Sequence, residues 1–407
     1  MGDNQDELVK TRAVSDGSLI DSVGGSIGNV EMRNRAADGL RGIASVVVAL
    51  SHFVHAFWPA LMRNDSADPE LNVQRMTLIE RVLGSPPATI FFNGHFAVLI
   101  FFVLSGFVLS RPAIDGKHNT LRSRAWGRYF RLNIPIAVAS LLSWLILTAG
   151  LNWNHEAAIL SSSDWFGEYF QRDISLLTLL KASLYAGLLG STVLIPPVWS
   201  LKVEFLGSLL LLSALALSPS RRGNLLSLAA CSLGIVLLKP DDFIFFLCFF
   251  AGAALNYVRI SVVAGVICTA LGLMLGAYRS SDGLFIWVPI FPSANTAYNA
   301  VGAVLLVAAV CRAGTAERFL QSSIPQFLGR ISYSLYLLHF IVLCTIASYT
   351  VVLVGVNPIG LTLSLAAYLL VTIILSVAFT RYIDSYAINS GHKFSLFVGL
   401  ADKAKSN

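Results

Sequence analysis

Long apolar segments recur along this chain at the length that spans a lipid bilayer. About 20 apolar residues in a helix cross the hydrocarbon core. Only 13% of the residues are charged and 55% are hydrophobic, whereas soluble domains carry about 25% charged residues. The sequence therefore predicts an all-α, polytopic integral membrane protein with about ten transmembrane helices in one bundle. The ten predicted spans lie near 40–58, 89–110, 132–151, 198–218, 224–239, 242–258, 260–278, 296–312, 332–355 and 359–380.

The distribution of basic residues predicts the side of the membrane on which each loop lies. Between the second and third spans, several arginines and one lysine accompany a single acidic residue, Asp115. Cytoplasmic loops carry such an excess of basic residues. The segment 152–196 is richer in acidic than in basic residues and is expected outside. Both termini are then cytoplasmic, and the net charge of +6 has this origin and gives no reason to expect nucleic acid.

One further apolar run, 174–195, is not counted as a crossing. It contains Lys181 and has acidic residues on its flanks. Counting it as a span would place every later basic loop outside, against the usual bias. We expect it to form an interfacial or re-entrant helix within the extracytoplasmic segment 152–196.

Three regions are expected along the chain. Residues 1–38 are polar and predict a flexible N-terminal tail rather than a signal peptide. Residues 39–385 form the transmembrane domain, and residues 386–407 a cytoplasmic C-terminal tail. The five cysteines lie in apolar runs without a C-x-x-C pair, so we expect neither a disulfide framework nor a metal site.

The first span contains ionisable residues, which are costly in hydrocarbon and mark functional sites. Arg41 and His52 are eleven residues apart, so they share one helical face with a rise of about 16 Å. Arg41 is expected at the cytoplasmic mouth and His52 near the middle of the membrane. His55 lies about 60° from that face, and for it we expect a hydrogen bond between helices.

Two more ionisable residues are expected near the depth of His52. Glu204 lies about 10 Å from the outer end of its span, and His339 lies about 12 Å from the inner end of its own. Together they predict a polar cavity in which a neutral imidazole acts as a general base and a carboxylate orients it. Pairing of Glu204 with Lys202 or with an arginine is the competing interpretation.

The stretch RSRAWGRYFRL places Arg124, Arg128 and Arg131 on one helical face. One interpretation is an interfacial helix that contacts lipid phosphates. The other is an arginine cluster that binds the phosphates of a cytoplasmic ligand such as coenzyme A. Ser105 lies about 9 Å from the inner face, where a small side chain permits either close helix packing or passage of a narrow pantetheine arm.

Taken together, LRGIASVVVALSH, FFVLSGFVLS, GRYFRL, VWSLKVEF and GRISYSLYLLH resemble, in order and position, the membrane-bound acyltransferase 3 family. The resemblance runs from about Arg41 to Asp384. Members of that family O-acylate sugars of surface polysaccharides, nodulation factors and some antibiotics. Two departures occur: Phe205 stands where many members have a second Glu, and Asp384-Ser385 replaces the usual Glu-Arg/Lys-Pro.

The resemblance implies roles for particular residues. Its Arg-x10-His motif corresponds to Arg41 and His52, with His52 at the catalytic position. Its Arg-x-x-Arg motif corresponds to Arg128 and Arg131, which are associated with donor binding. The remaining motif positions correspond to Trp199, Ser200, Leu201, Glu204, Ser332, Tyr333, Tyr336 and His339.

The expected function is transfer of an acyl group, acetyl above all, from cytoplasmic acyl-coenzyme A to a hydroxyl. The acceptor is a carbohydrate or a small hydroxylated metabolite, and the plasma membrane is the expected location. His52 and Glu204 are the expected catalytic residues, with no metal. The residues expected to contact donor or acceptor are Arg41, Ser105, Arg128 and Arg131 for the donor, and Trp199, Ser200, Tyr333, Tyr336 and His339 for the acceptor. A proton-coupled transporter or exporter is the alternative, and a non-catalytic scaffold or sensor is a third possibility.

Overall fold

The computed structural model describes residues 34–62, 77–116, 121–170, 174–218, 220–238, 242–279, 283–285 and 287–406, without the side chains of 122 and 398–406. Every regular element in these ranges is a helix, so the prediction of an all-α fold is confirmed. Residues 36–407 form one compact unit. Residues 1–33 of the predicted tail lie outside the described part.

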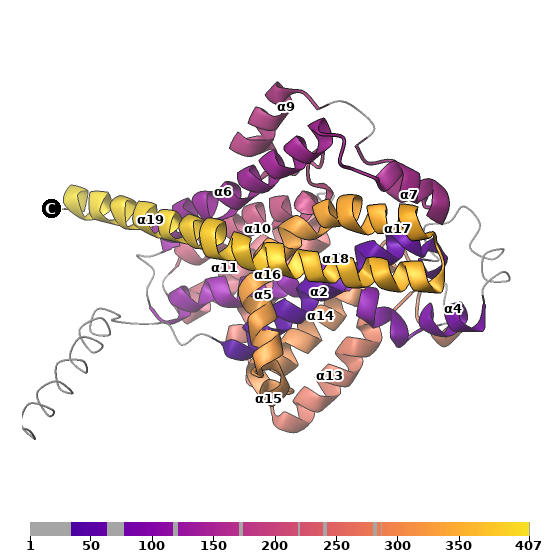
Figure 1. Ribbon diagram of the computed structural model, residues 1–407. Helices are drawn as coiled ribbons and strands as arrows, with labels where there is room; N and C mark the ends of the chain where they lie inside the picture. Colours follow the sequence, from indigo (N-terminus) through magenta and orange to yellow (C-terminus); the bar gives the residue numbers. More distant parts are fainter. Residues whose placement is uncertain are drawn as a thin grey trace, which may run out of the picture. The chain divides into compact units, whose positions relative to one another are not determined.

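The long helices match the predicted spans in order (Figure 1). They are α2 (Arg35–Phe57), α5 (Gly94–Ile114), α6 (Leu121–Thr148), α10 (Trp199–Ala216), α11 (Arg221–Leu238), α12 (Phe243–Ala254), α13 (Val262–Gly276), α14 (Ala294–Ala313), α16 (Ser323–Val342) and α18 (Pro358–Phe379). Eight helical segments of the described chain are long and apolar enough to cross a membrane. The segments Phe243–Tyr257 and Val262–Gly276 are apolar but shorter.

Two of these helices continue through a π-helical turn. Leu343–Ala347 joins α16 to α17 (Ser348–Val354), and Thr380–Asp384 joins α18 to α19 (Ser385–Ser406). The shorter helices and 3-10 turns lie in the connections. They are Pro59–Leu61, α4 (Leu78–Leu83), Ala88–Phe92, α7 (Asn154–Ser161), α8 (Asp164–Gly167), α9 (Leu176–Lys181), Pro196–Val198, Leu255–Tyr257, Gly283–Phe285 and α15 (Glu317–Leu320).

Two helices begin earlier than the apolar pattern predicts. α6 starts at Leu121 rather than near 132, so RSRAWGRYFRL is the first part of a spanning helix and not a separate loop helix. α2 starts at Arg35, and Asp38 in its first turn interacts favourably with the positive end of the helix dipole. Hydropathy marks where a helix enters hydrocarbon, which differs from where the helix itself begins.

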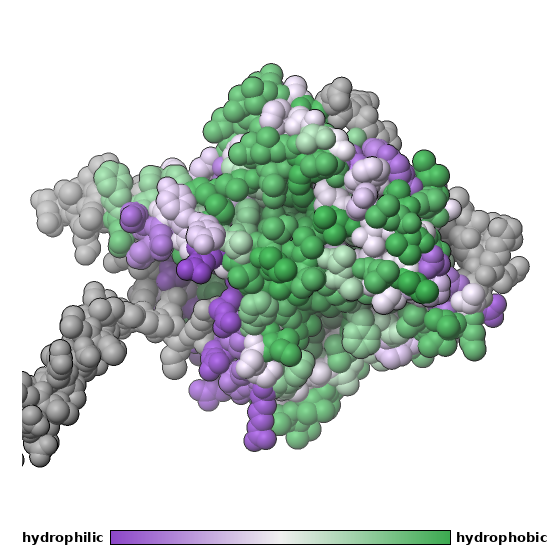
Figure 2. All heavy atoms as spheres, viewed as in Figure 1, coloured by the Kyte–Doolittle hydropathy of each residue, from purple (hydrophilic) through white to green (hydrophobic). Residues whose placement is uncertain are grey.

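The outer surface of the helices is apolar. Val263 and Leu226 are more than 70% exposed, as are Leu237 and Leu238. Figure 2 shows one face, on which hydrophobic residues cover the middle and hydrophilic residues gather towards the ends. Contiguous exposed apolar area of this extent indicates a membrane or interaction surface. Together with the eight candidate spans, it describes a multi-pass membrane protein.

The segment 174–195 enters the bundle along α6 and returns to the same end. Trp144 donates to the carbonyl of Ile174 (2.8 Å), and Ser143 donates to that of Leu194 (2.7 Å). Between these two contacts, Tyr129 donates to the carbonyl of Leu184 (2.6 Å). Fifteen residues of α6 separate Trp144 from Tyr129, a rise of about 22 Å. The segment therefore runs along α6 and turns back towards the end where it began, which is the path expected of a re-entrant helix.

A π-helical turn, Ala182–Ala186, forms the deep part of this re-entrant segment. Asn133 donates to the carbonyl of Ser183 (2.8 Å), next to the Tyr129 bond. Irregular backbone at membrane depth requires such partners within the protein. α9 has 6 residues and this turn has 5, and together they rise about 16 Å, roughly half the hydrocarbon thickness.

α2 and α16 contact each other through glycines and run in the same direction. A Cβ on Gly42 would overlap the backbone of Leu328 and Gly329, and a Cβ on Gly329 would overlap the carbonyl of Asp38. Ten residues later on each helix, His52 Nδ1 and His339 Nε2 are 3.0 Å apart. Two contacts separated by ten residues on both helices require parallel axes. Small residues permit this close approach in membranes.

Candidate functional site

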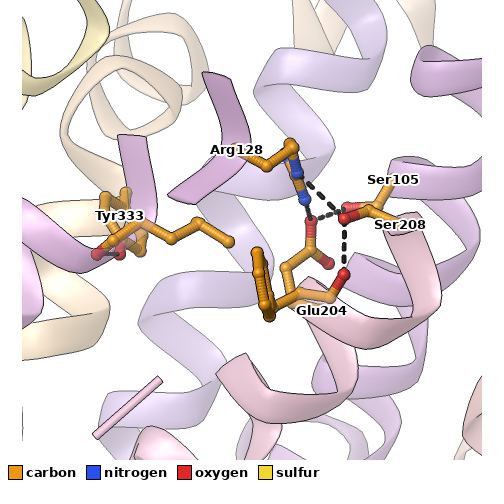
Figure 3. Close-up of polar contacts among 7 residues, drawn as sticks. Ser105, Arg128, Glu204, Ser208 and Tyr333 are labelled. Atoms are coloured by element: carbon orange, nitrogen blue, oxygen red, sulfur yellow. Dashed lines mark hydrogen bonds and ion pairs between the residues drawn. The ribbon is translucent and has the colours of Figure 1, made fainter. Parts of the chain in front are cut away.

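An ion pair between α6 and α10 forms the centre of the first polar cluster. Arg128 donates from Nη2 to Glu204 Oε1 and from Nε to Ser208 Oγ, the latter at 3.1 Å. Ser105 on α5 donates to the same Glu204 oxygen at 2.9 Å. Figure 3 shows Ser105, Ser208 and Arg128 converging beside Glu204, with Tyr333 further away. Arg128 is 7% exposed, and a buried charge needs this kind of pairing.

The local sequence explains this arrangement. Ser208 follows Glu204 by one helical turn, so both side chains lie on the face of α10 that meets α6. Lys202 points elsewhere and pairs with Asp242 at 3.3 Å. Of the two partners proposed for Glu204, the structure therefore selects an arginine.

A second group of charges surrounds Arg131, one turn beyond Arg128. The charge of Arg131 interacts with those of Arg128 and Arg41 and with the carboxylates of Asp384 and Glu204. Arg131 is exposed at the surface of the protein, whereas Asp384 is buried, with 8% of it exposed. Arg41 also forms a 3.9 Å ion pair with Asp38. Three of the predicted donor-binding residues thus share one electrostatic environment.

The two histidines of the predicted site lie in direct contact. His52 Nδ1 and His339 Nε2 are 3.0 Å apart, and His339 Nδ1 is 3.1 Å from the carbonyl oxygen of Leu335. A carbonyl oxygen only accepts, so Nδ1 of His339 carries the proton. In the neutral pair, Nε2 of His339 then accepts and Nδ1 of His52 donates. The proton of His52 is thereby fixed on Nδ1, which leaves its Nε2 with a lone pair.

Aromatic residues from the segment 152–196 cover the histidine pair. The indole of Trp165 stacks on His55 at 3.9 Å between centroids and on His52 at 5.8 Å. Ser163 fixes this segment by donating to the carbonyl of His55 (2.8 Å). Tyr169 packs against Trp165 at 5.2 Å, and burial, followed by repulsion from Glu168, raises the pKa of Tyr169 to about 12.

Ser200 and Tyr336 lie between the two polar clusters. Their hydroxyl oxygens are 2.6 Å apart, and Tyr336 also donates to the carbonyl of Pro197 (3.0 Å). His339 follows Tyr336 by three residues and Glu204 follows Ser200 by four, on helices that run in opposite directions. The histidine pair and the Arg128–Glu204 pair therefore lie about 10 Å apart along the helix axes.

The structure does not join all the predicted residues. Among the described residues, no hydrogen bond links His52 to Glu204, and it is His339 that contacts His52. Tyr333 donates to the carbonyl of Leu132 on α6 (2.9 Å), and the ring of Trp199 packs against Phe245 on α12. These two residues hold helices together in this structure.

Three neighbours of the site did not emerge from the sequence as site residues. Ser208 is recognisable because it lies one turn from Glu204 on the same face. Asp384 lay beyond the last predicted span, and the π-helical turn that ends at this residue gives no sequence signal. Trp165 lies in the four-residue helix α8, which is too short for the helical period to predict.

Comparison with protein families identifies the family of this chain. The family model described as an acyltransferase domain, of the acyltransferase 3 type, matches residues 34–381. The chain belongs to the acyltransferase 3 family. No curated protein and no solved structure matched the chain. Membership in the acyltransferase 3 family identifies the chain as a membrane acyltransferase. The matched range contains the Arg128–Glu204 pair and the His52–His339 pair.

The contacts of this acyltransferase domain define what each cluster can do chemically. The Arg41, Arg128 and Arg131 guanidiniums present several N–H donors, which suit phosphate oxygens. The lone pair on His52 Nε2 suits acceptance of a proton from a hydroxyl. Among the described residues, no group of three or more His, Cys, Asp or Glu side chains forms a metal site.

Proposed function

We propose that this protein transfers an acyl group, acetyl above all, from acyl-coenzyme A to a hydroxyl of a carbohydrate or small hydroxylated metabolite. The observation that carries the proposal is the His52–His339 contact, whose tautomers leave a lone pair on His52 Nε2. Arginines that suit the donor's phosphates lie on the predicted cytoplasmic side of it. Family membership supports the acyltransferase activity itself.

In the proposed reaction, His52 Nε2 removes the proton of the acceptor hydroxyl as its oxygen attacks the thioester carbonyl carbon. The tetrahedral intermediate expels the coenzyme A thiolate, which takes the proton from the imidazolium. The products are an ester and free coenzyme A. Hydrogen bonding to His339 orients His52 throughout, as the third group does in other base-assisted acyl transfers.

Glu204 has a different role in this proposal from the one the sequence suggested. It binds Arg128, Ser105 supports the same carboxylate oxygen, and Ser208 accepts from Arg128 Nε. Glu204 therefore fixes the direction of the Arg128 guanidinium towards the donor. It acts on catalysis through donor position rather than through His52.

Donor binding and acyl transfer are measured separately on protein purified into nanodiscs. We expect Arg131→Gln to weaken acetyl-coenzyme A binding about tenfold or more, since hydrogen bonds to charged groups contribute about 1.5–3 kcal/mol. His52→Gln should preserve donor binding and lower coenzyme A release with acceptor by about 100-fold or more. Arg318→Gln, on the exposed α15, is the control.

The acceptor is identified by mass spectrometry of envelope glycans and secreted metabolites from cells with and without the gene. Loss of an acetyl increment in the His52→Gln strain supports the proposal. A proton-coupled transporter would bind no acetyl-coenzyme A and would change the location of a metabolite, with no change in its mass. A scaffold or sensor would leave every readout intact in the His52→Gln strain.

A further inference from the structure

A basic cleft lies outside the motifs that carry the proposed function. It has a volume of about 290 Å³ and is formed at the ends of α5, α11 and α14 and by the 3-10 turn after α12. Three of its nine lining residues are arginines, Arg221, Arg259 and Arg312, and none of the nine is acidic. None of these arginines belongs to a motif with an expected role.

The walls of the cleft are held by hydrogen bonds that leave most guanidinium donors available. Arg221 Nη2 donates to the carbonyl of Tyr257 (3.3 Å), and Arg312 Nε donates to that of Val258 (2.8 Å). The Arg221 guanidinium also lies 5.6 Å from the centre of the Tyr257 ring. A guanidinium carries five N–H donors, so each of these bonds uses one. The bonds fix the direction of the arginines before a ligand arrives.

The cleft is open where α5 ends. Gly116 has a φ of 75°, which favours glycine, and a Cβ added there would meet no atom within 4 Å. The basic loops predict that this end of the bundle faces the cytoplasm. The expected donor arginines are predicted at the same end of the bundle, so the cleft and the expected donor site face one side of the membrane in this topology.

We propose that this cleft binds a phosphate ester. Several arginines without a carboxylate, held in fixed directions at the membrane interface, match the geometry and charge of a phosphate group. The phosphate comes either from an anionic phospholipid headgroup or from the nucleotide end of coenzyme A. The site itself does not depend on acyl transfer, so it stands apart from the proposed function.

The test uses the double variant R221Q/R312Q, in which the glutamine at 312 can place its amide N–H where Arg312 Nε donates to the carbonyl of Val258. R222Q is the matched control, because Arg222 is the exposed neighbour of Arg221 on α11 and does not line the cleft. One arm measures phosphatidylglycerol retained by native mass spectrometry. The other arm measures coenzyme A affinity in nanodiscs of phosphatidylcholine alone.

We expect R221Q/R312Q to lose at least tenfold in one arm, with R222Q unchanged. Loss of lipid retention identifies a headgroup as the ligand, and loss of coenzyme A affinity identifies the donor's phosphates. If the double variant does not fold, R259Q removes a third cleft guanidinium without touching either backbone bond. Lipid retention and coenzyme A affinity that are both unchanged would overturn the proposal. If the wild-type protein binds no coenzyme A at all, the proposed function is contradicted. The measurement of lipid retention can still be interpreted in that case.

Discussion

His52 depends on the ring beside it for the position of its own proton. The carbonyl of Leu335 holds the proton of His339 on Nδ1, and the free Nε2 of His339 then holds the proton of His52 on Nδ1. The lone pair that remains on His52 follows from these two bonds. His339, which the sequence assigned to the acceptor, becomes in the proposed reaction a positioning residue for His52.

A comparison of His339→Ala with His339→Gln tests this positioning role. The alanine removes the ring nitrogen that accepts from His52 Nδ1, and loss of such a hydrogen bond costs about 1–3 kcal/mol. We expect kcat to fall about 5- to 150-fold with little change in the KM for acetyl-coenzyme A. The glutamine side-chain oxygen can accept the same hydrogen, so His339→Gln should recover much of the loss. Equal kcat values for the two variants and wild type would contradict the assigned tautomers.

The sequence placed His52, Glu204 and His339 near one depth from the helical rise of about 1.5 Å per residue, whereas the structure puts Glu204 about 10 Å from the histidine pair along the helix axes. The sequence could not decide which pairs touch either, because that depends on which helices are neighbours and how each is rotated. The neighbours and the rotation of α2 and α16 are set by contacts of Gly42 and Gly329. A glycine in the sequence does not indicate which helix will pack against it. The structure accordingly separates Glu204 from His52 and pairs it with Arg128.

At the scale of elements, the segment 174–195 shows that an apolar run can lie along a spanning helix without completing a crossing of its own. Hydropathy and charge indicated that 174–195 did not complete a crossing, but they left its depth open. Three donors on α6, Tyr129, Ser143 and Trp144, fix that depth by binding its carbonyls at different levels. Its deepest turn contacts Tyr129, the residue after Arg128.

The short helix α4 carries a pH-dependent attachment to the end of α2. Glu80 accepts from the indole of Trp58 (2.8 Å) and from the backbone of Thr77 (2.8 Å). These bonds, that to Trp58 first, lower the pKa of Glu80 below its usual 4.5. The attachment is therefore fully present above pH 4.5 and is lost as the pH falls through the lower folded value.

Hydrogen exchange of residues 77–84, corrected for the intrinsic pH dependence, measures this attachment. We expect protection to be constant from pH 7 to 5 and to fall at more acidic pH. Glu80→Gln removes the titrating group, so its protection should be lower at neutral pH and flat with pH. A wild-type profile that follows the Glu80→Gln profile would show that this carboxylate does not hold α4.

At the scale of the whole molecule, the direction of α16 bears on the topology. α2 and α16 are parallel, as their two contacts require. Ten predicted spans make α16 the ninth, which runs in the same direction as the first. A full crossing by 174–195 would make it the tenth and would reverse it. The parallel axes thus require an even number of crossings from α2 up to α16, which ten spans without 174–195 satisfy.

Single cysteines introduced at exposed positions test this topology. A membrane-impermeant maleimide should label Glu156→Cys in intact cells, and should label Asp115→Cys and Arg222→Cys only after permeabilisation. The wild-type protein is the control, since its five cysteines lie within helices. Labelling of Arg222→Cys in intact cells would mean that the segment before α10 crosses completely.

The contact of Gly42 with Gly329 has a consequence for how this protein tolerates insertions. Each histidine follows its glycine by ten residues, so the two helices keep the same count between packing point and base. One residue added after Gly329 would turn His339 by about 100° and shift it by about 1.5 Å. The hydrogen bond to His52 would then be lost although every chemical group of the site was still present. The number of residues between the packing point and the histidine is therefore fixed on both helices, apart from what the side chains in the interval contribute.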